Sequence, residues 1–166
     1  MQQPSVAILM GSDSDRPTLD AAITTLREFS IGCEARVLSA HRSPEAVRRF
    51  VEEAPRRGIK IFIAAAGGAA HLAGFVAAHT TLPVIGVPIE SKLMNGLDSL
   101  LSTVQMPKGV PVATVAVGNA TNAAVLAVQI LAIGDRALRL RLATFKRRLA
   151  AKTLQADQDL QLKLPR

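Results

Sequence analysis

Near its amino end the chain reads SVAILMGSDSD over residues 5–15, an apolar run rich in Val and Ile that stops at a glycine and short polar residues. A run of this length and composition predicts a buried β-strand. Behind it, Pro17 suits the first turn of a helix, and the apolar residues that follow at helical spacing are Leu19, Ala22, Ile23 and Leu26. The chain therefore opens with a predicted strand, polar turn and helix, the unit of parallel α/β sheets.

The same alternation of apolar runs and helical patterns continues along the chain. Further strands are predicted over residues 34–38, 60–66, 83–87 and 111–117, and further helices over 44–54, 70–78 and 122–133. Five strands separated by helices predict a three-layer α/β sandwich, in which helices cover both faces of a doubly wound parallel sheet. We expect the flavodoxin-like strand order 2-1-3-4-5.

One more helix is predicted after the sheet is complete, from about residue 135 to about 150. Its apolar stripe consists of Leu138, Leu142, Phe145 and Leu149. Because helices already cover both faces of the predicted sheet, this stripe needs another surface, such as that of a neighbouring subunit. We expect residues 1–152 to form a single α/β domain that includes this helix, and residues 153–166 to form a polar, basic tail that frays.

Composition narrows the class of protein. The 166 residues are 49% hydrophobic, which is enough to build one folded core. Aromatic residues make up only 3%, with no Trp or Tyr, and this argues against sites that stack bases or a flavin on aromatic rings. The single cysteine, Cys33, excludes a disulfide framework and a cysteine-based metal cluster. With no signal segment or membrane-spanning run in the sequence, we expect a cytoplasmic protein.

The net charge of +7 is concentrated at the carboxyl end. Residues 134–166 hold nine Lys or Arg and three Asp or Glu, whereas residues 1–133 hold eleven and ten. A basic segment of this kind binds nucleic acids, binds membrane surfaces or simply forms the solvated face of a helix. Because no aromatic residues accompany the charge, we interpret it as a solvated face and expect neither a nucleic-acid nor a membrane partner.

Three polar loops follow the first three predicted strands. They span residues 11–15, 39–45 and 67–71. Since the carboxyl ends of parallel strands meet at one edge of the sheet, where ligands bind, these loops should lie together. They bring hydroxyls, short carboxylates, Arg42, two histidines and glycines, and the helix N-termini beside them favour an anion such as phosphate.

Each of these features also has a structural interpretation. Asp13 and Ser43 suit helix caps, the Gly67-Gly68 pair suits a tight turn, and His79 lies in an apolar helical stretch where a structural role is the simpler interpretation. His41 differs, because Arg42 adjoins it at a strand end and could hold a phosphate beside a proton-transfer group.

The sequence lacks the signature motifs of other nucleotide-binding families. The chain has no Gly-x-Gly-x-x-Gly after the first strand and no Gly-x-x-x-x-Gly-Lys-Ser/Thr, so the dinucleotide and P-loop interpretations fail. The third strand ends in Ala-Ala-Ala-Gly-Gly without an aspartate, which argues against a phospho-accepting receiver. The three histidines are scattered and form no set of metal ligands with supporting carboxylates, so we expect no metal site.

The chain resembles the PurE family of purine biosynthesis in six segments. They are MGSDSD (10–15), SAHRSP (39–44), AGGAAHL (66–72), TTLPVIGVP (80–88), NGLDSLLS (95–102) and VQMP (104–107). The resemblance covers residue 5 to about 150 in the family's order, and the GGAAHL version is similar to the bacterial mutase class. It departs from the family in loop 118–123, which is two residues shorter, and at Ala73 and His79, where a proline and a lysine are common.

This resemblance implies a mutase that converts 5-carboxyaminoimidazole ribonucleotide to 4-carboxy-5-aminoimidazole ribonucleotide by decarboxylation and recarboxylation, with no metal or redox cofactor. It implies a homo-octamer with active sites near subunit boundaries. It also implies that His41 transfers the proton, that Ser12 and Asp15 hold the substrate, and that Ser39 and Arg42 meet its phosphate. The residues that would frame the base and the carbon dioxide are Gly67, Gly68, Ala70, His71 and Leu72.

Two other functions stay open on the sequence alone. One is a direct carboxylase of the same fold that joins aminoimidazole ribonucleotide to carbon dioxide. The other is a non-catalytic nucleotide- or RNA-binding domain that uses the basic tail.

Overall fold

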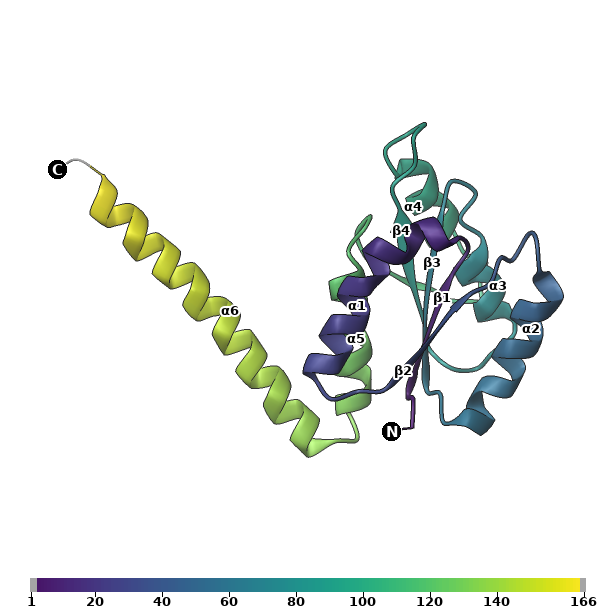
Figure 1. Cartoon of the computed structure of the whole chain (residues 1–166), viewed down its shortest axis with the longest axis horizontal. Helices are drawn as coiled ribbons and strands as arrows, with labels where there is room; N and C mark the ends of the chain where they lie inside the picture. The colour runs from purple at the N-terminus through teal and green to yellow at the C-terminus, as the bar shows by residue number, and fades with distance from the viewer. Residues whose placement is uncertain (1–2, 165–166) are drawn as a thin grey trace. The chain divides into compact units, whose positions relative to one another are not determined.

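The computed structural model describes residues 3–164 and contains a five-stranded parallel sheet in the order β2-β1-β3-β4-β5 (Figure 1). The strands are β1 (Val6–Met10), β2 (Cys33–Val37), β3 (Ile61–Gly67), β4 (Val84–Ile89) and β5 (Ala113–Thr114). Ile8 of β1 lies opposite Ala35 of β2 and Ile63 of β3, and Ile63 in turn lies opposite Ile85 of β4. The predicted fold class and strand order are confirmed.

Helices cover both faces of the sheet. They are α1 (Arg16–Glu28), α2 (Pro44–Glu53), α3 (Leu72–Ala78), α4 (Leu97–Val104), α5 (Ala120–Ala132) and α6 (Arg136–Lys163), with short 3-10 turns η1 (Asp13–Asp15) and η2 (Ala54–Arg57). Helices α1 and α5 lie on one side of the strands, and α2 and α3 lie on the other (Figure 1). This is the doubly wound arrangement that the alternating pattern predicts.

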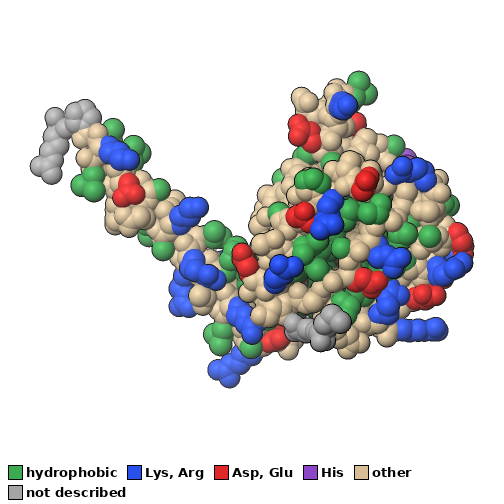
Figure 2. All heavy atoms as spheres, in the orientation of Figure 1, with side chains coloured by type: hydrophobic (Ala, Val, Ile, Leu, Met, Phe, Trp, Pro, Cys, Tyr) green, Lys and Arg blue, Asp and Glu red, His purple; other side chains and the backbone are tan. Residues whose placement is uncertain are grey.

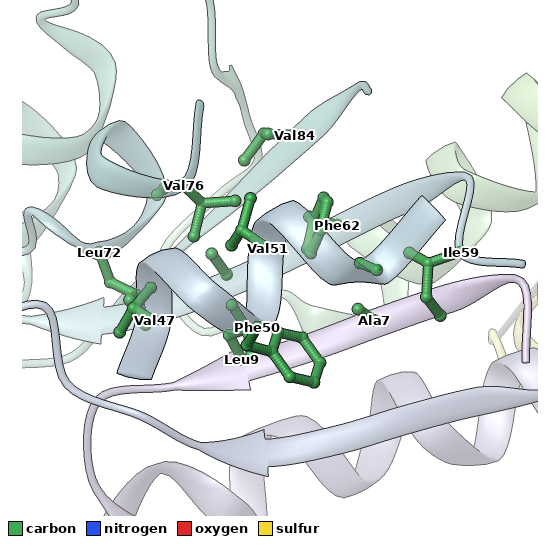
Figure 3. Close-up of a cluster of buried hydrophobic side chains, with 13 residues drawn as sticks. Ala7, Leu9, Val47, Phe50, Val51, Ile59, Phe62, Leu72, Val76 and Val84 are labelled. Carbon is green, nitrogen blue, oxygen red and sulfur yellow. The ribbon is translucent and has the colours of Figure 1, made fainter. Parts of the chain in front are cut away.

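The core beneath α2 and α3 is built from alternate residues of the central strands. Ala7, Leu9 and Phe62 point from the sheet toward Val47, Val51 and Val76 of the two helices, and all six side chains are fully buried (Figure 3). All five residues of β1 are buried, as a central parallel strand with both faces covered requires. This rigid centre positions the loops at the strand ends.

The edge strands differ from the prediction. β2 is largely exposed, with Val37 at 53% exposure, so the covering of both faces does not extend to this edge. β5 pairs with β4 only at Ala113 and Thr114, which is shorter than the predicted run over residues 111–117. Pro111 has no N–H to donate to a strand ladder, which limits pairing at the start of that run.

Helix α4 lies in a stretch for which the sequence pattern predicts no helix. It has only eight residues, and its apolar residues Leu97, Leu101 and Val104 are 46–47% exposed instead of forming a buried stripe. The helix packs closely on β4, where Gly86 leaves no room for a Cβ beside the Thr103 side chain. The apolar face of this helix is therefore exposed, and its opposite side packs on the sheet.

Hydrogen bonds hold loop 118–123 at both of its ends. The Gly118 N–H donates to the Pro88 carbonyl at 2.8 Å, and Gly118 takes a positive φ of 70° that suits glycine. Asn119 Oδ1 accepts the Asn122 N–H at 3.0 Å in the first turn of α5. These hydrogen bonds join the loop to β4 and to the first turn of α5.

The chain divides into two compact units, Met1–Ala127 and Val128–Arg166. In the second unit, the Asp135 side chain caps α6 by accepting the Leu138 N–H at 3.0 Å. Leu138 and Leu142 are buried and Leu149 is 52% exposed, so only part of the predicted stripe is uncovered. Lys and Arg side chains recur along α6 (Figure 2). Among the described residues, no helix is long and apolar enough to cross a membrane.

The expected fraying after residue 152 is wrong, because α6 continues to Lys163. Residues 151–163 are rich in Ala, Leu, Gln and Lys, which favour helix, and contain neither glycine nor proline. Gln155 Nε2 also donates a hydrogen bond at 3.0 Å to Asp159 Oδ1, one turn further along, and this stabilises the helix. The segment is polar and exposed, as expected, but helical.

Candidate active site

A cleft of ≈ 380 Å³ lies where the loops after β1, β2 and β3 meet. Seven of the ten predicted site residues line it: Ser12, Asp15, Ser39, His41, Arg42, Gly67 and Leu72. Gly68, Ala70 and His71 belong to the same loops but do not line the cleft. The lining residues that the sequence did not single out are Gly11, Ser14, Ala40, Ala66 and Ala69. All five adjoin predicted residues in the three loops, and that adjacency is the signal that would have found them.

The β1 loop turns at once into η1, and hydroxyls hold it there. Ser12, and not Asp13, caps this turn: its Oγ accepts the Ser14 N–H at 3.3 Å and lies 2.9 Å from the Ser14 Oγ. Ser14 Oγ also lies 3.3 Å from Asp15 Oδ1. These hydrogen bonds hold the turn so that Asp15 lines the cleft, although the residue is only 8% exposed.

Arg42 joins the first two loops. Its Nη2 donates to the Gly11 carbonyl at 2.5 Å, and its Nε and backbone N–H both reach Ser39 Oγ, at 3.4 and 3.2 Å. Ser43 lies at the N-cap of α2 but makes no side-chain cap bond; its hydroxyl instead bonds the Ser39 backbone N–H and carbonyl, both at 3.1 Å. The guanidinium is thus held at the rim with donors that can meet an anion.

The two loop histidines meet. His41 Nε2 and His71 Nδ1 lie 2.9 Å apart, with the rings edge to face at 88°. Because one nitrogen must donate and the other accept, a single proton is shared across this contact. If His41 donates, its Nδ1 is an unprotonated base; if it accepts, its neutral Nδ1 carries a proton and is an acid. The pair can therefore switch the state that His41 presents to a ligand.

His79 has surroundings typical of a structural histidine. Its ring stacks on Phe75 with centroids 4.5 Å apart, and its Nδ1 lies 2.8 Å from the Phe75 carbonyl oxygen. It does not line the cleft at His41. Across residues 3–164, no three His, Cys, Asp or Glu side chains gather as metal ligands would.

Burial raises the pKa of the Asp15 carboxyl above its ordinary 3.8, because a desolvated site disfavours the charged form; hydrogen bonds from Ser14 and Ser12 partly oppose this. A carboxyl whose pKa is higher in the folded than in the unfolded chain stabilises the fold fully below the unfolded pKa, and this contribution is lost as the pH rises through the folded pKa. At neutral pH, ionised Asp15 therefore costs stability.

Asp15→Asn is accordingly expected to raise the thermal midpoint at pH 7, by about 2–4 °C for each kcal/mol of stability regained. The gain should shrink as the pH falls and Asp15 of the parent protein becomes protonated. Thermal unfolding at several pH values measures it, and exposed Asp13→Asn is the matched control. A lower midpoint for Asp15→Asn at pH 7 would contradict the stated cost.

Comparisons with known proteins identify relatives of this chain. Residues 5–152 match the family described as AIR carboxylase. An N5-carboxyaminoimidazole ribonucleotide mutase from Mycobacterium tuberculosis is 52% identical over 160 residues, which is 96% of this chain and 92% of that protein. The crystal structure of Treponema denticola PurE superposes with a TM-score of 0.87 at 30% identity, covering 95% of this chain and 98% of that one.

A fungal relative carries a different name. The phosphoribosylaminoimidazole carboxylase of Ogataea methanolica is 53% identical over 133 residues, which is 80% of this chain but 24% of that protein. The matched part of that carboxylase is therefore one segment of a longer polypeptide.

Proposed function

The chain belongs to the AIR carboxylase family, to which PurE belongs, and from this premise we propose that it is an N5-carboxyaminoimidazole ribonucleotide mutase of purine biosynthesis. The observation that carries the proposal is identity of 49–52% over at least 95% of the chain to relatives with that name. The enzyme is then an isomerase, because it moves a carboxylate within one molecule.

The proposed reaction conserves protons. As the carbamate N–C bond breaks, carbon dioxide leaves and the exocyclic nitrogen takes up one proton. The electron-rich ring carbon then attacks the retained carbon dioxide, and the proton on that carbon is removed. One proton is taken up and one is released, so a single acid/base group suffices, and imidazole titrates in the right range for this work.

The cleft supports a role for each of its polar groups. We assign the proton transfer to His41, with His71 as its hydrogen-bonded neighbour at 2.9 Å. Ser39 and Arg42 are assigned to the substrate phosphate, Ser12 and Asp15 to the remaining polar groups of the ribonucleotide, and the segment from Gly67 to Leu72 to the base and the carbon dioxide. Carbon dioxide must not escape to water, and Leu72 and Ala66 supply apolar wall at the cleft.

A direct carboxylase is the second candidate, and the name of the fungal relative favours it. Purified protein should be assayed with the carbamate substrate and, separately, with aminoimidazole ribonucleotide while bicarbonate is varied. The mutase proposal expects turnover of the carbamate at a rate independent of added bicarbonate. Turnover of aminoimidazole ribonucleotide that rises with bicarbonate, without use of the carbamate, would replace the first proposal with the second.

We further propose a cytoplasmic homo-octamer. The exposed apolar residues of α4 (Leu97, Leu101 and Val104) and Leu149 of α6 supply surface that assembly would remove from water. Residues 1–152 are proposed as the catalytic domain.

Sedimentation velocity at micromolar concentration is expected to give a particle of about eight times the 17.6-kDa chain mass. The double variant Leu97→Asp and Leu101→Asp should shift it to smaller species, because each buried carboxylate at an interface is costly. Lys60→Asp, an exposed change directly before the amino end of β3, is the control. A monomer with full activity would contradict the octamer.

A further inference from the structure

The backbone of Gly68 forms hydrogen bonds with side chains of α4, a helix that does not line the cleft. The Gly68 N–H donates to Ser99 Oγ of α4 at 2.8 Å. The Gly68 carbonyl accepts the Ala70 N–H at 2.8 Å and lies 3.3 Å from Ser102 Oγ, whose shorter contact is with the Asp98 carbonyl at 2.8 Å. Two serines of one helix, separated by a single turn, therefore reach both polar groups of the same peptide.

Ser99 is the stronger of the two contacts, and its surroundings make it hard to replace. The residue is fully buried, so water does not readily substitute for its hydroxyl. Gly68 takes a positive φ of 64°, a conformation that its neighbours must hold in place. The hydrogen bond thus fixes a left-handed turn between the end of β3 and the start of α3.

The position of Ser99 is itself fixed at the start of α4. Asp98 Oδ1 accepts the Ser99 N–H at 2.9 Å and the Ser91 hydroxyl at 2.6 Å. The Ser91 hydroxyl in turn accepts the Gly96 N–H at 3.3 Å. These hydrogen bonds join the loop before α4 to the first turn of that helix, and they restrict the position of Ser99 relative to Gly68.

The turn that Ser99 holds carries His71. Only Ala69 and Ala70 separate Gly68 from His71, and the Ala70 N–H bonds back to Gly68. A rotation of the Gly68 peptide therefore moves the His71 ring relative to His41. The two rings share a proton only while His41 Nε2 and His71 Nδ1, now 2.9 Å apart, stay within hydrogen-bond distance. The phosphate-side residues Ser39 and Arg42 lie on the loop after β2, and their own side-chain hydrogen bonds join them to each other and to Gly11 and Ser43, within the first two loops.

We propose that Ser99 is a positioning residue for the proton-transfer pair: through Gly68 it sets the contact between His71 and His41. Ser99 does not line the cleft, and Ser39 and Arg42, which are assigned to the phosphate, lie on another loop, so the loss of Ser99 should slow turnover by more than it weakens substrate binding. The inference rests on the proposed mutase function for its kinetic readout and on the histidine contact alone for its spectroscopic one.

The test compares Ser99→Ala with Thr103→Val in the full chain. Thr103 lies one turn further along α4, is also buried, and uses its hydroxyl only to donate to the Ser99 carbonyl at 2.7 Å. Ser99→Ala is expected to lower kcat about 10-fold or more, the size of effect that small misplacements of reacting groups produce, with KM changed by less than about 2-fold. Thr103→Val should leave both constants within about 2-fold of the parent.

Imidazole ¹⁵N chemical shifts give the second readout, with His79 as an internal reference. Ser99→Ala should move the ring signals of His41 and His71 and leave those of His79 in place; Thr103→Val should move none of them. Equal kcat in the two variants, a rise in KM as the main effect, or unmoved His41 and His71 signals would each overturn the inference.

Two further outcomes are separable. If the parent protein does not turn over the carbamate, the proposed function fails, and the ¹⁵N shifts alone decide the positioning role. If Ser99→Ala does not fold, Ser99→Cys retains the side-chain shape with a weaker acceptor. Its kcat is then expected to fall about 3-fold at unchanged KM, and a kcat equal to that of the parent would overturn the inference.

Discussion

Replacement of His41 by asparagine is expected to lower kcat by roughly 10²–10⁴-fold, the range lost when an acid/base group is removed. Asparagine retains polarity and much of the volume of the side chain, but its amide does not act as an acid or a base near neutral pH. It also ends the sharing of a proton with His71 Nδ1. Substrate binding should persist, because the phosphate-side groups Ser39 and Arg42 are unchanged. Steady-state assays with the carbamate substrate give kcat and KM separately.

His79→Asn is the matched control for this variant. His79 is the one histidine of the chain that neither lines the cleft nor contacts His41, and its ring stacks on Phe75. Its replacement should leave kcat within about 2-fold, whatever it does to the thermal midpoint. If His41→Asn retains turnover close to that of the control, proton transfer belongs to another group.

Arg42→Lys is expected to raise KM about 10-fold or more with kcat little changed. A guanidinium offers paired donors to a phosphate in a planar fork, whereas an ammonium group is a point charge, and one charge-assisted hydrogen bond is worth about 1.5–3 kcal/mol. Lysine also cannot reproduce the contacts of Arg42 with the Gly11 carbonyl and Ser39 Oγ at the same time. The loss therefore combines a weaker phosphate contact with a less ordered rim.

Arg48→Lys serves as the control for the loss of a guanidinium. Arg48 lies on α2 outside the cleft lining and pairs with Glu45 and Glu52 on the helix surface. Exposed pairs of this kind contribute little, so both kinetic constants should stay near those of the parent. A fall in kcat at constant KM for Arg42→Lys would place Arg42 in the chemical step and contradict a phosphate role.

Most of the fold could be predicted from the sequence. The apolar run at residues 5–10 predicts β1, which the structure gives as Val6–Met10, and the sheet order 2-1-3-4-5 is the one observed. Such features are local: a buried parallel strand needs a short apolar run, and a helix needs apolar residues at its own spacing. Where local pattern and packing disagree, the prediction is wrong or silent, as at α4, at the short β5 and after residue 152.

For the site, the sequence indicated which loops meet but not how their side chains touch. The carboxyl ends of parallel strands share one edge, so the grouping of the three loops follows from strand order alone. That Ser12 and not Asp13 caps η1, and that Ser43 turns back to Ser39 and leaves α2 without a side-chain cap, depends on rotamers and distances that no motif records.

The sequence by itself determined the order of the elements, the loops that form the cleft and the residue types available there. Only the tertiary structure decided that His41 meets His71 across 30 residues and that Ser99 holds Gly68 across 31. The physical reason is range. Periodicity and turn chemistry act over a few neighbouring residues, whereas a hydrogen bond between distant residues requires strand register and helix packing to bring two atoms within about 3 Å.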